Sequence, residues 1–381
     1  MMKHIKILFF LIIMILPLLV SCDNGSGKGH ARTDGDTLCL KYAENLTMVD
    51  YGDYTVAKFR NPWDTTRTLE TFVLVPRDKQ LPAAVPQGTV VRVPLQRSIV
   101  YTSVHNSLLE ELGALDAIAG VCDAKYIHKQ PIRERIDGGA IADCGTSMTP
   151  NIEKILMIKP DAILLSAFEN SNDHNKVAQV GIPIIDCIDY METSPLGRAE
   201  WIRFFGRLYG KSEVADSIFA ATEKSYNDIK AAVAGITERP AVLTDLIYGQ
   251  TWNMPGAYST TGVLIEDAGG KNPFDTYKKS GSVQLAPEEV LFKAKDADFW
   301  LIKYSQNSPM TMRQLGSDNA IYSKFNAYAN GNVYGCNTDR TSYYEEASFH
   351  PHWLLAEFAE ILHPELGTFG DNHHYYEKIQ P

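Results

Sequence analysis

The sequence predicts an α/β protein with two similar lobes that are joined by one long helix, plus a β-rich extension before the first lobe. Three observations support this fold class. Residues 95–196 alternate near-continuous apolar strands with helices, a pattern that is typical of a parallel sheet covered on both faces. Residues 237–367 repeat that plan, which indicates an internal duplication. Between these regions, residues 197–236 carry apolar side chains at helical spacing.

Residues 1–21 have the pattern of a cleaved export signal. Two lysines near the start precede an apolar run over residues 7–20, which is shorter than a membrane-spanning helix requires. The run ends in the letters LVSC, which resemble a bacterial lipobox. That resemblance implies that Cys22 becomes the acylated first residue, followed by a tether over residues 22–36. An uncleaved anchor helix is the alternative. With either one, we expect the body of the protein in the cell envelope, facing the periplasm.

The composition narrows the partners. The formal net charge is -10, and binding to phosphates needs a basic surface, so a nucleic-acid partner is disfavoured. The chain holds 19 Tyr and 5 Trp, residue types that suit a surface gripping a ligand. Its cysteines show no Cys-x-x-Cys spacing, so we expect buried free thiols. The sequence also allows a disulfide between Cys122 and Cys144.

The N-terminal extension, residues 37–94, alternates polar and apolar side chains between turn signals around Gly52 and Pro62. This pattern predicts a small antiparallel β region. We expect the region to pack on the main body, and Trp63 is the side chain best suited to that contact.

The first lobe begins with a buried strand in the letters RSIVYTS, after which Ser103 or Asn106 is expected to cap a helix. The letters AIAGVCD predict the next strand. Residues 151–157 predict a helix, and AILLSA predicts the strand that follows it. The letters VAQVGIPIIDCID predict a short helix, a glycine turn and a further strand.

The long bridging helix is predicted from Ser212, as its N-cap, to Gly235, as its C-cap. About 23 residues at a rise of 1.5 Å give a rod of roughly 35 Å, which is long enough to run along a domain. Its apolar positions are Val214, Ile218, Tyr226, Ile229 and Val233.

The second lobe repeats the arrangement and ends before a polar tail at 368–381. The letters RPAVLTDLIYG predict its first strand. Helices are expected over residues 259–269, 287–295 and 351–362, with a strand in ADFWLIKY and another over 331–336. The duplication is visible in two segments: NIEKIL precedes PDAIL in the first lobe, and APEEVL precedes ADFWL in the second.

Six stretches carry a family resemblance: RSIVYTSVHNSLLEELGALDAIAGV, PNIEKILMIKPDAILLS, SPLGRAEWIRFFGRLYGKSEVADSIF, WNMPGAYSTTGVLIEDAGGKNPF, LAPEEVLFKAKDADFWLI and HPHWLLAEFAEILHPEL. In this order they are similar to the solute-binding proteins of ABC importers for cobalamin, haem and ferric siderophores. The resemblance covers residues 95–367. It implies two Rossmann-like lobes, a ligand held between them and no intrinsic cofactor. It also implies a monomer that works with a membrane permease and its ATPase.

The resemblance assigns a docking role to two glutamates. The family's lobes each present a glutamate to arginines of the permease, and the matching positions are Glu153 and Glu288. Two carboxylates on two lobes would orient the encounter and fix its register. The simpler interpretation is that each carboxylate stabilises the first turn of its helix. With the family pattern and the duplication together, we favour docking.

The ligand is expected at the carboxyl ends of the parallel strands, where open α/β sheets bind ligands. Tyr126 matches a family position with an aromatic ligand contact. Arg340 could pair with a carboxylate or phosphate of the ligand. Tyr126, Trp252 and Arg340 are the strongest candidates. The full set is Ser103, His105, Tyr126, Phe168, Glu169, Tyr190, Tyr248, Trp252, Tyr258, Tyr304, Arg340 and Tyr343.

Ferric siderophore, haem and cobalamin all suit such an aromatic site, and His105 could ligate haem iron or cobalt if it is not simply a hydrogen-bonded histidine. A remoter alternative is direct binding of Zn²⁺ or Mn²⁺. The histidines available for it are His105, His128, His174, His350, His352, His373 and His374. The sequence contains no GxSxG, HExxH, P-loop or strand-linked GxGxxG motif, so we do not expect an enzyme.

Overall fold

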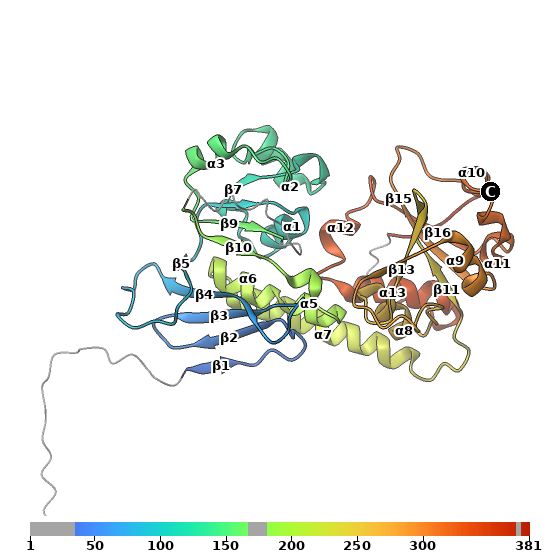
Figure 1. Cartoon of the computed structure of the whole chain (residues 1–381), viewed down its shortest axis with the longest axis horizontal. Coiled ribbons are helices and arrows are strands. Elements are labelled where there is room, and N and C mark those ends of the chain that lie inside the picture. Colours follow the sequence, from blue (N-terminus) through green and yellow to red (C-terminus); the bar gives the residue numbers. More distant parts are fainter. Residues whose placement is uncertain (1–34, 167–180, 371–374) are drawn as a thin grey trace, which may run out of the picture. The chain divides into compact units, whose positions relative to one another are not determined.

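The computed structural model describes residues 35–166, 181–370 and 375–381. Within these ranges the strands form sheets of five, five, four and three strands (Figure 1). The α/β class, the parallel central sheets, the long helix between them and the N-terminal β extension are confirmed. The expected export signal, Cys22, Phe168, Glu169, His174, His373 and His374 lie outside the described residues.

The N-terminal extension forms a five-stranded sheet in chain order. Its strands are β1 (Asp36–Leu38), β2 (Leu46–Asp50), β3 (Thr55–Arg60), β4 (Thr68–Pro76) and β5 (Thr89–Val93). The first four pair antiparallel, as predicted, whereas β5 runs parallel to β4. This last pairing differs from the prediction because residues 77–88 carry the chain back along the sheet before β5 begins.

The extension is attached to the main body by an aromatic core and by two buried carboxylates. The Phe59 ring lies 4.8 Å from the ring of Trp201 and 5.1 Å from that of Phe204. Glu200, which is fully buried, accepts hydrogen bonds of 2.7–2.9 Å from the backbone amides of residues 41–43. Glu192 accepts 2.9 Å bonds from the amides of residues 44 and 45. Trp63 packs at the edge of the same core.

The first lobe contains a parallel sheet in the order β10-β9-β6-β7-β8. Its strands are β6 (Ser98–Val100), β7 (Ile118–Val121), β8 (Ala142–Asp143), β9 (Ala162–Leu165) and β10 (Ile184–Asp186). Its described α-helices are α1 (Ser103–Glu111), α2 (Gln130–Asp137) and α3 (Ile152–Ile158). Thr102, and not Ser103 or Asn106, caps α1, because its hydroxyl accepts from the amide of His105.

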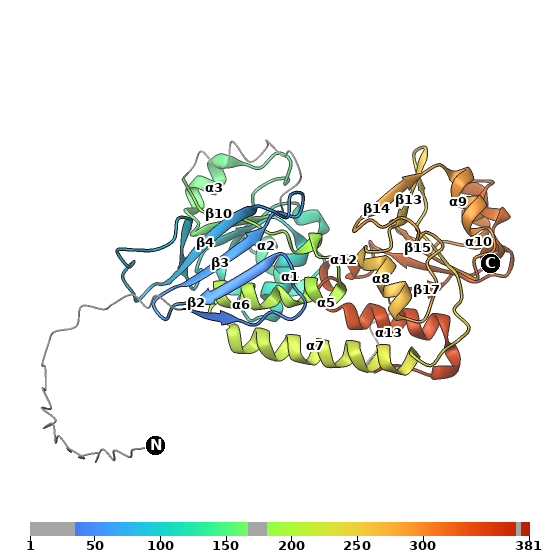
Figure 2. The ribbon, with the colours of Figure 1, turned by 60° about the horizontal axis from the view of Figure 1, so that its bottom comes forward.

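Three consecutive helices join the lobes: α5 (Pro195–Glu200), α6 (Ile202–Tyr209) and α7 (Ser212–Val233). The 22-residue α7 packs against α6 and against α13 of the second lobe (Figure 2). Its caps differ from the prediction. Lys211 is the N-cap and makes no side-chain cap bond, and Ala234 is the C-cap. Val214 is 41% exposed, because the buried stripe runs through Ala215 and Phe219 instead.

The second lobe has a mixed sheet in the order β11-β15-β16-β17. The strands β11 (Val242–Thr244), β15 (Phe299–Tyr304) and β16 (Val333–Asn337) are parallel, and β17 (Glu377–Lys378) is antiparallel. The end of the chain is therefore not a free polar tail, and Tyr375, Tyr376 and Ile379 are buried. The helices are α8 (Thr260–Asp267), α9 (Pro287–Ala294), α10 (Met312–Asp318), α11 (Asn326–Ala329), α12 (Tyr343–Glu346) and α13 (Pro351–Leu362).

A separate antiparallel sheet of β12 (Ile247–Tyr248), β13 (Thr251–Pro255) and β14 (Ser282–Leu285) was not predicted. The letters RPAVLTDLIYG, expected to be one strand, divide at Asp245, whose φ is 56°. Cys122 and Cys144 are free, so the disulfide that the sequence allows is not formed. In the described ranges, no helix combines the length and apolarity that crossing a membrane would require.

Candidate functional site

Two short segments present exposed tyrosines where strands of the two lobes end. In the first lobe, Asp123 lies just beyond β7, and Tyr126 follows three residues later at the end of a short 3-10 helix. In the second lobe, Asp245 follows β11, and Tyr248 comes three residues later on β12. Tyr126 is 56% exposed and Tyr248 is 82% exposed. The two predicted tyrosines therefore share an Asp-x-x-Tyr spacing, but the backbone between aspartate and tyrosine differs.

Both aspartates adopt a backbone conformation that L-residues rarely occupy. The φ angle is 52° at Asp123 and 56° at Asp245. Such a conformation costs of order 1–3 kcal/mol, and Asp tolerates it better than most residues because its short side chain bonds locally. Strain of this kind concentrates at functional sites, where the surrounding structure holds it. The repeated Asp-x-x-Tyr spacing after an apolar strand is a signal that the sequence analysis missed.

A charged pair lies behind the second of these segments. The Lys303 ammonium is 2.6 Å from the Asp245 carboxylate and 5.7 Å from the centre of the Tyr343 ring. Burial disfavours the charge, but Tyr343 and Asp245 outweigh it and raise the pKa of Lys303. Burial raises the pKa of Tyr343 to about 12. At neutral pH the cluster therefore holds a cationic lysine and a neutral phenol.

His105, predicted to contact the ligand, is instead part of the core. It is 1% exposed, its Nε2 lies 2.9 Å from an Asp189 carboxylate oxygen, and its Nδ1 lies 2.7 Å from the Thr102 hydroxyl. Burial alone would raise the pKa of Asp189, but His105 and Arg198 lower it to about 2. Both ring nitrogens of His105 are engaged in hydrogen bonds. In the structure His105 is therefore the hydrogen-bonded histidine that the sequence analysis gave as the alternative to a ligand contact.

Trp252 also differs from the prediction, because its side chain is fully buried. The indole N–H donates to the Thr244 carbonyl at 3.0 Å, and the ring packs 5.8 Å from Trp300 and 5.5 Å from Phe325. The residue lies on β13, whose alternation turns it into the core, while the neighbouring Thr251 and Asn253 are partly exposed.

The remaining predicted ligand contacts are partly or largely exposed. Tyr258 is 51% exposed, and the Lys278 ammonium lies 5.6 Å from its ring centre. The Tyr304 hydroxyl accepts from the amide of Met310 at 3.1 Å, so its orientation is fixed. Burial raises the pKa of Tyr190 to about 12. Arg340 is exposed and Ser103 is partly exposed at the start of α1. Tyr344, beside Tyr343, is 57% exposed.

Loops of the two lobes meet through α12. The backbone amides of His128 and Lys129, just after the Tyr126 turn, donate to a Glu345 carboxylate at 3.0 and 3.4 Å. Lys129 also forms an ion pair with Glu346. His350 Nε2 lies 2.8 Å from the carboxylate of Glu111. The Tyr126 turn is thus tied directly to the helix that carries Tyr343.

The two predicted docking glutamates occupy matching positions. Glu153 is the second residue of α3, and Glu288 is the second residue of α9. Both are exposed. In the part of the chain that the structure describes, neither carboxylate has a hydrogen bond or an ion pair. Their neighbour Glu289, by contrast, accepts a hydrogen bond from the Tyr277 hydroxyl.

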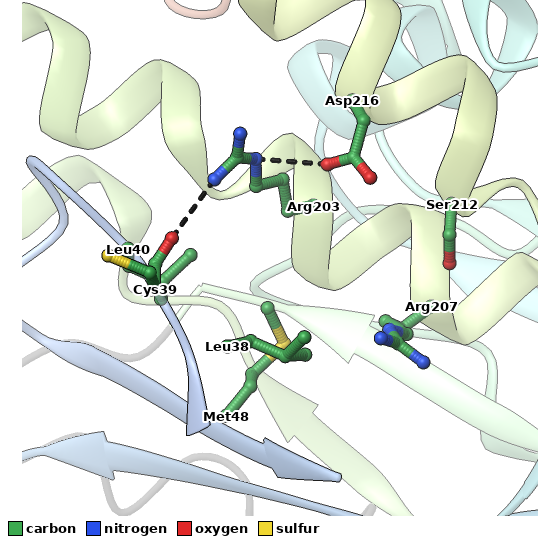
Figure 3. Close-up of a pocket in the computed structure, with 8 residues that line it drawn as sticks. All are labelled: Leu38, Cys39, Leu40, Met48, Arg203, Arg207, Ser212 and Asp216. Atoms are coloured by element: carbon green, nitrogen blue, oxygen red, sulfur yellow. Dashed lines mark hydrogen bonds and ion pairs between the residues drawn. The ribbon is translucent and has the colours of Figure 1, made fainter. Parts of the chain in front are cut away.

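A pocket of about 220 Å³ lies away from these tyrosines, between the extension and the bridging helices (Figure 3). Arg203 forms one wall, where it donates to the Cys39 carbonyl at 3.2 Å and pairs with Asp216 at 3.0 Å. Arg207 pairs with Asp50 at 3.1 Å. Both guanidinium groups are thus paired with carboxylates of the chain itself. The contacts of Arg203 with Cys39 and of Arg207 with Asp50 attach the extension to the bridging helices. As for metals, no three His, Cys, Asp or Glu side chains gather as a metal site among the described residues.

The family model described as periplasmic binding protein matches residues 99–339. An uncharacterized lipoprotein of Methanocaldococcus jannaschii is 26% identical over 90% of this chain and 86% of its own length.

Three solved structures share the fold. They are a periplasmic heme binding protein of Pseudomonas aeruginosa (TM-score 0.58, 14% identity, 75% of this chain and 99% of that one), a molybdate periplasmic binding protein of Haemophilus influenzae (0.56, 16%, 71% and 87%), and an Fe³⁺-hydroxamate transport protein of Saccharomonospora viridis (0.55, 18%, 71% and 94%).

Proposed function

The chain belongs to the periplasmic binding protein family, and from that membership we propose that it captures a metal chelate, either a ferric siderophore or haem, and delivers it to an ABC permease and its ATPase. The observation that carries the proposal is the pair of exposed tyrosines, Tyr126 and Tyr248, each three residues after an aspartate with positive φ. One tyrosine belongs to each lobe, so we expect a planar ligand held between the lobes to contact an aromatic ring of each.

The surroundings of these tyrosines support a chelate as the ligand. Aromatic rings stack on flat apolar surfaces, and a tyrosine oxygen can also ligate ferric haem iron. The exposed Arg340 would pair with a ligand carboxylate. Cobalamin is the first alternative, since it is also a large chelate, and a bare Zn²⁺ or Mn²⁺ ion is the remoter one.

The proposed location follows from the family and from the N-terminal sequence. Family members work outside the cytoplasm, and the relative in Methanocaldococcus jannaschii is named a lipoprotein. We infer that Cys22 carries the lipid anchor that holds this chain at the membrane surface, where several acyl chains would bind stably.

Titration of the purified protein with haemin, a ferric hydroxamate, cyanocobalamin and molybdate, followed by visible absorbance or calorimetry, tests the proposal. One of the two iron chelates should bind tightly. The variants Tyr126→Ala and Tyr248→Ala should each lower the affinity for that chelate about tenfold, because each removes one stacking surface. The matched control is Glu153→Gln with Glu288→Gln, which should bind the chelate as the natural protein does. Tight binding of molybdate or of a free metal ion alone would contradict the proposal.

A further inference from the structure

Helix α12 contacts both lobes, although its sequence belongs to the second. Tyr343 lies beside Lys303 of β15, and the next residue, Tyr344, is 57% exposed. The two residues that follow, Glu345 and Glu346, contact the first lobe instead. Within one helix of four residues, the chain therefore combines candidate ligand contacts with an attachment to the opposite lobe.

Glu345 is the buried part of this attachment. Its side chain is 2% exposed, and one carboxylate oxygen accepts hydrogen bonds from the amides of His128 and Lys129 at 3.0 and 3.4 Å. Both amides lie at the start of α2, where the N-cap residue Lys129 makes no side-chain cap bond. Burying a carboxylate is costly unless hydrogen bonds compensate for the lost water, so the two amides and Glu345 stabilise each other. The second lobe thus supplies the acceptor that fixes this backbone of the first.

The backbone that Glu345 fixes is the segment that carries Tyr126. His128 comes two residues after Tyr126, and Ile127 between them is buried in the first-lobe core. Before the tyrosine, the Tyr126 amide donates to the Asp123 carbonyl at 2.9 Å. The segment is therefore held on both sides of an exposed tyrosine, and one of these two attachments comes from the opposite lobe.

The chain after α12 is anchored to the first lobe without Glu345. Phe349 is 3% exposed and belongs to the first-lobe core, where its ring centre lies 5.9 Å from that of Phe205 and 6.2 Å from that of His105. A variant that lacks the Glu345 carboxylate should therefore still fold with this segment attached to the first lobe.

We propose that Glu345 is a positioning residue for ligand binding, which fixes Tyr126 of the first lobe relative to Tyr344 of the second. A pair of contacts that is fixed before the ligand arrives loses less conformational entropy on binding. The two tyrosines then contribute to affinity as a coupled pair. This inference rests on the proposed function, because the tyrosines contact a ligand only if a chelate is held between the lobes.

The first test measures the affinity of the purified protein for haemin and for a ferric hydroxamate. Glu345→Ala should lower the affinity for the chelate that binds about tenfold. Glu345→Gln should restore most of it, because its amide oxygen can still accept from both backbone amides. The matched control is Glu357→Ala, which removes another buried carboxylate that accepts from an amide, here that of Tyr376 in the second lobe, and should bind normally. Hydrogen exchange of amides 128 and 129 should accelerate in Glu345→Ala and stay unchanged in the control.

A double-mutant cycle separates positioning from support of the fold. In the natural protein, Tyr126→Ala and Tyr344→Ala should each cost about tenfold in affinity, but the pair should cost about 20-fold and not the 100-fold of independent contacts. In a Glu345→Ala background the two losses should multiply. A general loss of stability would lower every affinity by the same factor and leave the coupling unchanged.

Two results overturn the inference alone. Normal affinity in Glu345→Ala, with exchange of amides 128 and 129 accelerated, would show that the contact does not position the site, and the proposed function would stand. Equal coupling of Tyr126 and Tyr344 with and without Glu345 would limit this residue to the stability of the fold. If the natural protein binds neither haemin nor the ferric hydroxamate, the proposed function itself fails, and the inference fails with it.

Discussion

At the scale of single residues, Asp245 has two roles that the sequence does not separate. It occupies a left-handed backbone conformation, and it neutralises the half-buried Lys303 at 2.6 Å. Asp123 shares the backbone conformation but forms no ion pair within the described residues, and its carboxylate accepts from the amide of Ser147. The comparison between the two positions can therefore isolate the ion pair.

We predict that Asp245→Ala lowers the free energy of unfolding by about 3–5 kcal/mol, because it strains the turn and leaves Lys303 without its counter-charge. Asp123→Ala should cost about 1–2 kcal/mol, from the turn and one hydrogen bond. Urea unfolding followed by circular dichroism measures both. Equal losses at the two positions would show that the Lys303 pair contributes nothing.

Glu357 gives the stability of the protein a dependence on pH. Burial raises its pKa from 4.5 to about 8, against the opposing hydrogen bond from the Tyr376 amide. The folded state therefore holds a proton that the unfolded state has released, and stability falls as pH rises from about 4.5 to about 8. Glu357→Gln should remove most of that decline in denaturant midpoints, whereas the exposed Glu365→Gln should leave it unchanged. A decline that persists in Glu357→Gln would refute the assignment.

At the scale of elements, prediction was best where periodicity and caps agreed. The last helix, α13, has the bounds that the sequence predicts, and Asn151 and Ser259, the first residues of two other predicted helices, are the N-caps of α3 and α8. At α1, the sequence offers Thr102, Ser103 and Asn106 as polar residues that could cap the helix, and the structure has Thr102 as the N-cap. The β12–β14 sheet was missed because Asp245 interrupts an apolar run without a glycine or proline to mark the turn.

The same limit applies to the candidate site. The order of strands along the sequence predicted which residues lie in the segments after the strands. Tyr126, Tyr248 and Tyr258 were placed in such segments, and all three are exposed. The sequence did not predict whether a given side chain points into the core or toward solvent. Trp252 points into the core from β13, which pairs with β14. His105 points into the core because its ring bonds to the buried Asp189.

The hydrogen bonds from the backbone amides of residues 41–43 to Glu200 can be tested for their contribution to holding the segment before β2. Glu200→Gln removes the negative charge that three backbone amides share, and a charge-assisted bond contributes about 1.5–3 kcal/mol. Hydrogen exchange of amides 41–43 should accelerate about 10- to 100-fold. The control Glu223→Gln touches the same segment only through the side chains of Lys41 and Tyr42, and it should have a much smaller effect. Equal acceleration in both would show that Glu200 is not the principal clamp.

At the scale of the whole molecule, α7 limits how the lobes can move. It packs against both α6 and α13, and a single helix bends less freely than a pair of extended linkers. We predict that chelate binding changes the radius of gyration by no more than about 1–2 Å. Small-angle scattering of the free and bound protein measures this change, and a larger contraction would show that α7 does not restrain the lobes.

The contacts of Glu200, Glu192 and Phe59 that attach the extension to the main body have a consequence for any shortened form of the chain. The family model begins at residue 99, so a protein trimmed to the family's common core would discard β1–β5. Glu200 and Glu192 would lose the backbone amides that solvate them, and Trp201 and Phe204 would lose the aromatic ring that covers them. The core alone would then expose a surface that combines apolar aromatic side chains with two carboxylates. We therefore expect the smallest autonomous folding unit of this chain to include β1–β5, which the family model does not cover.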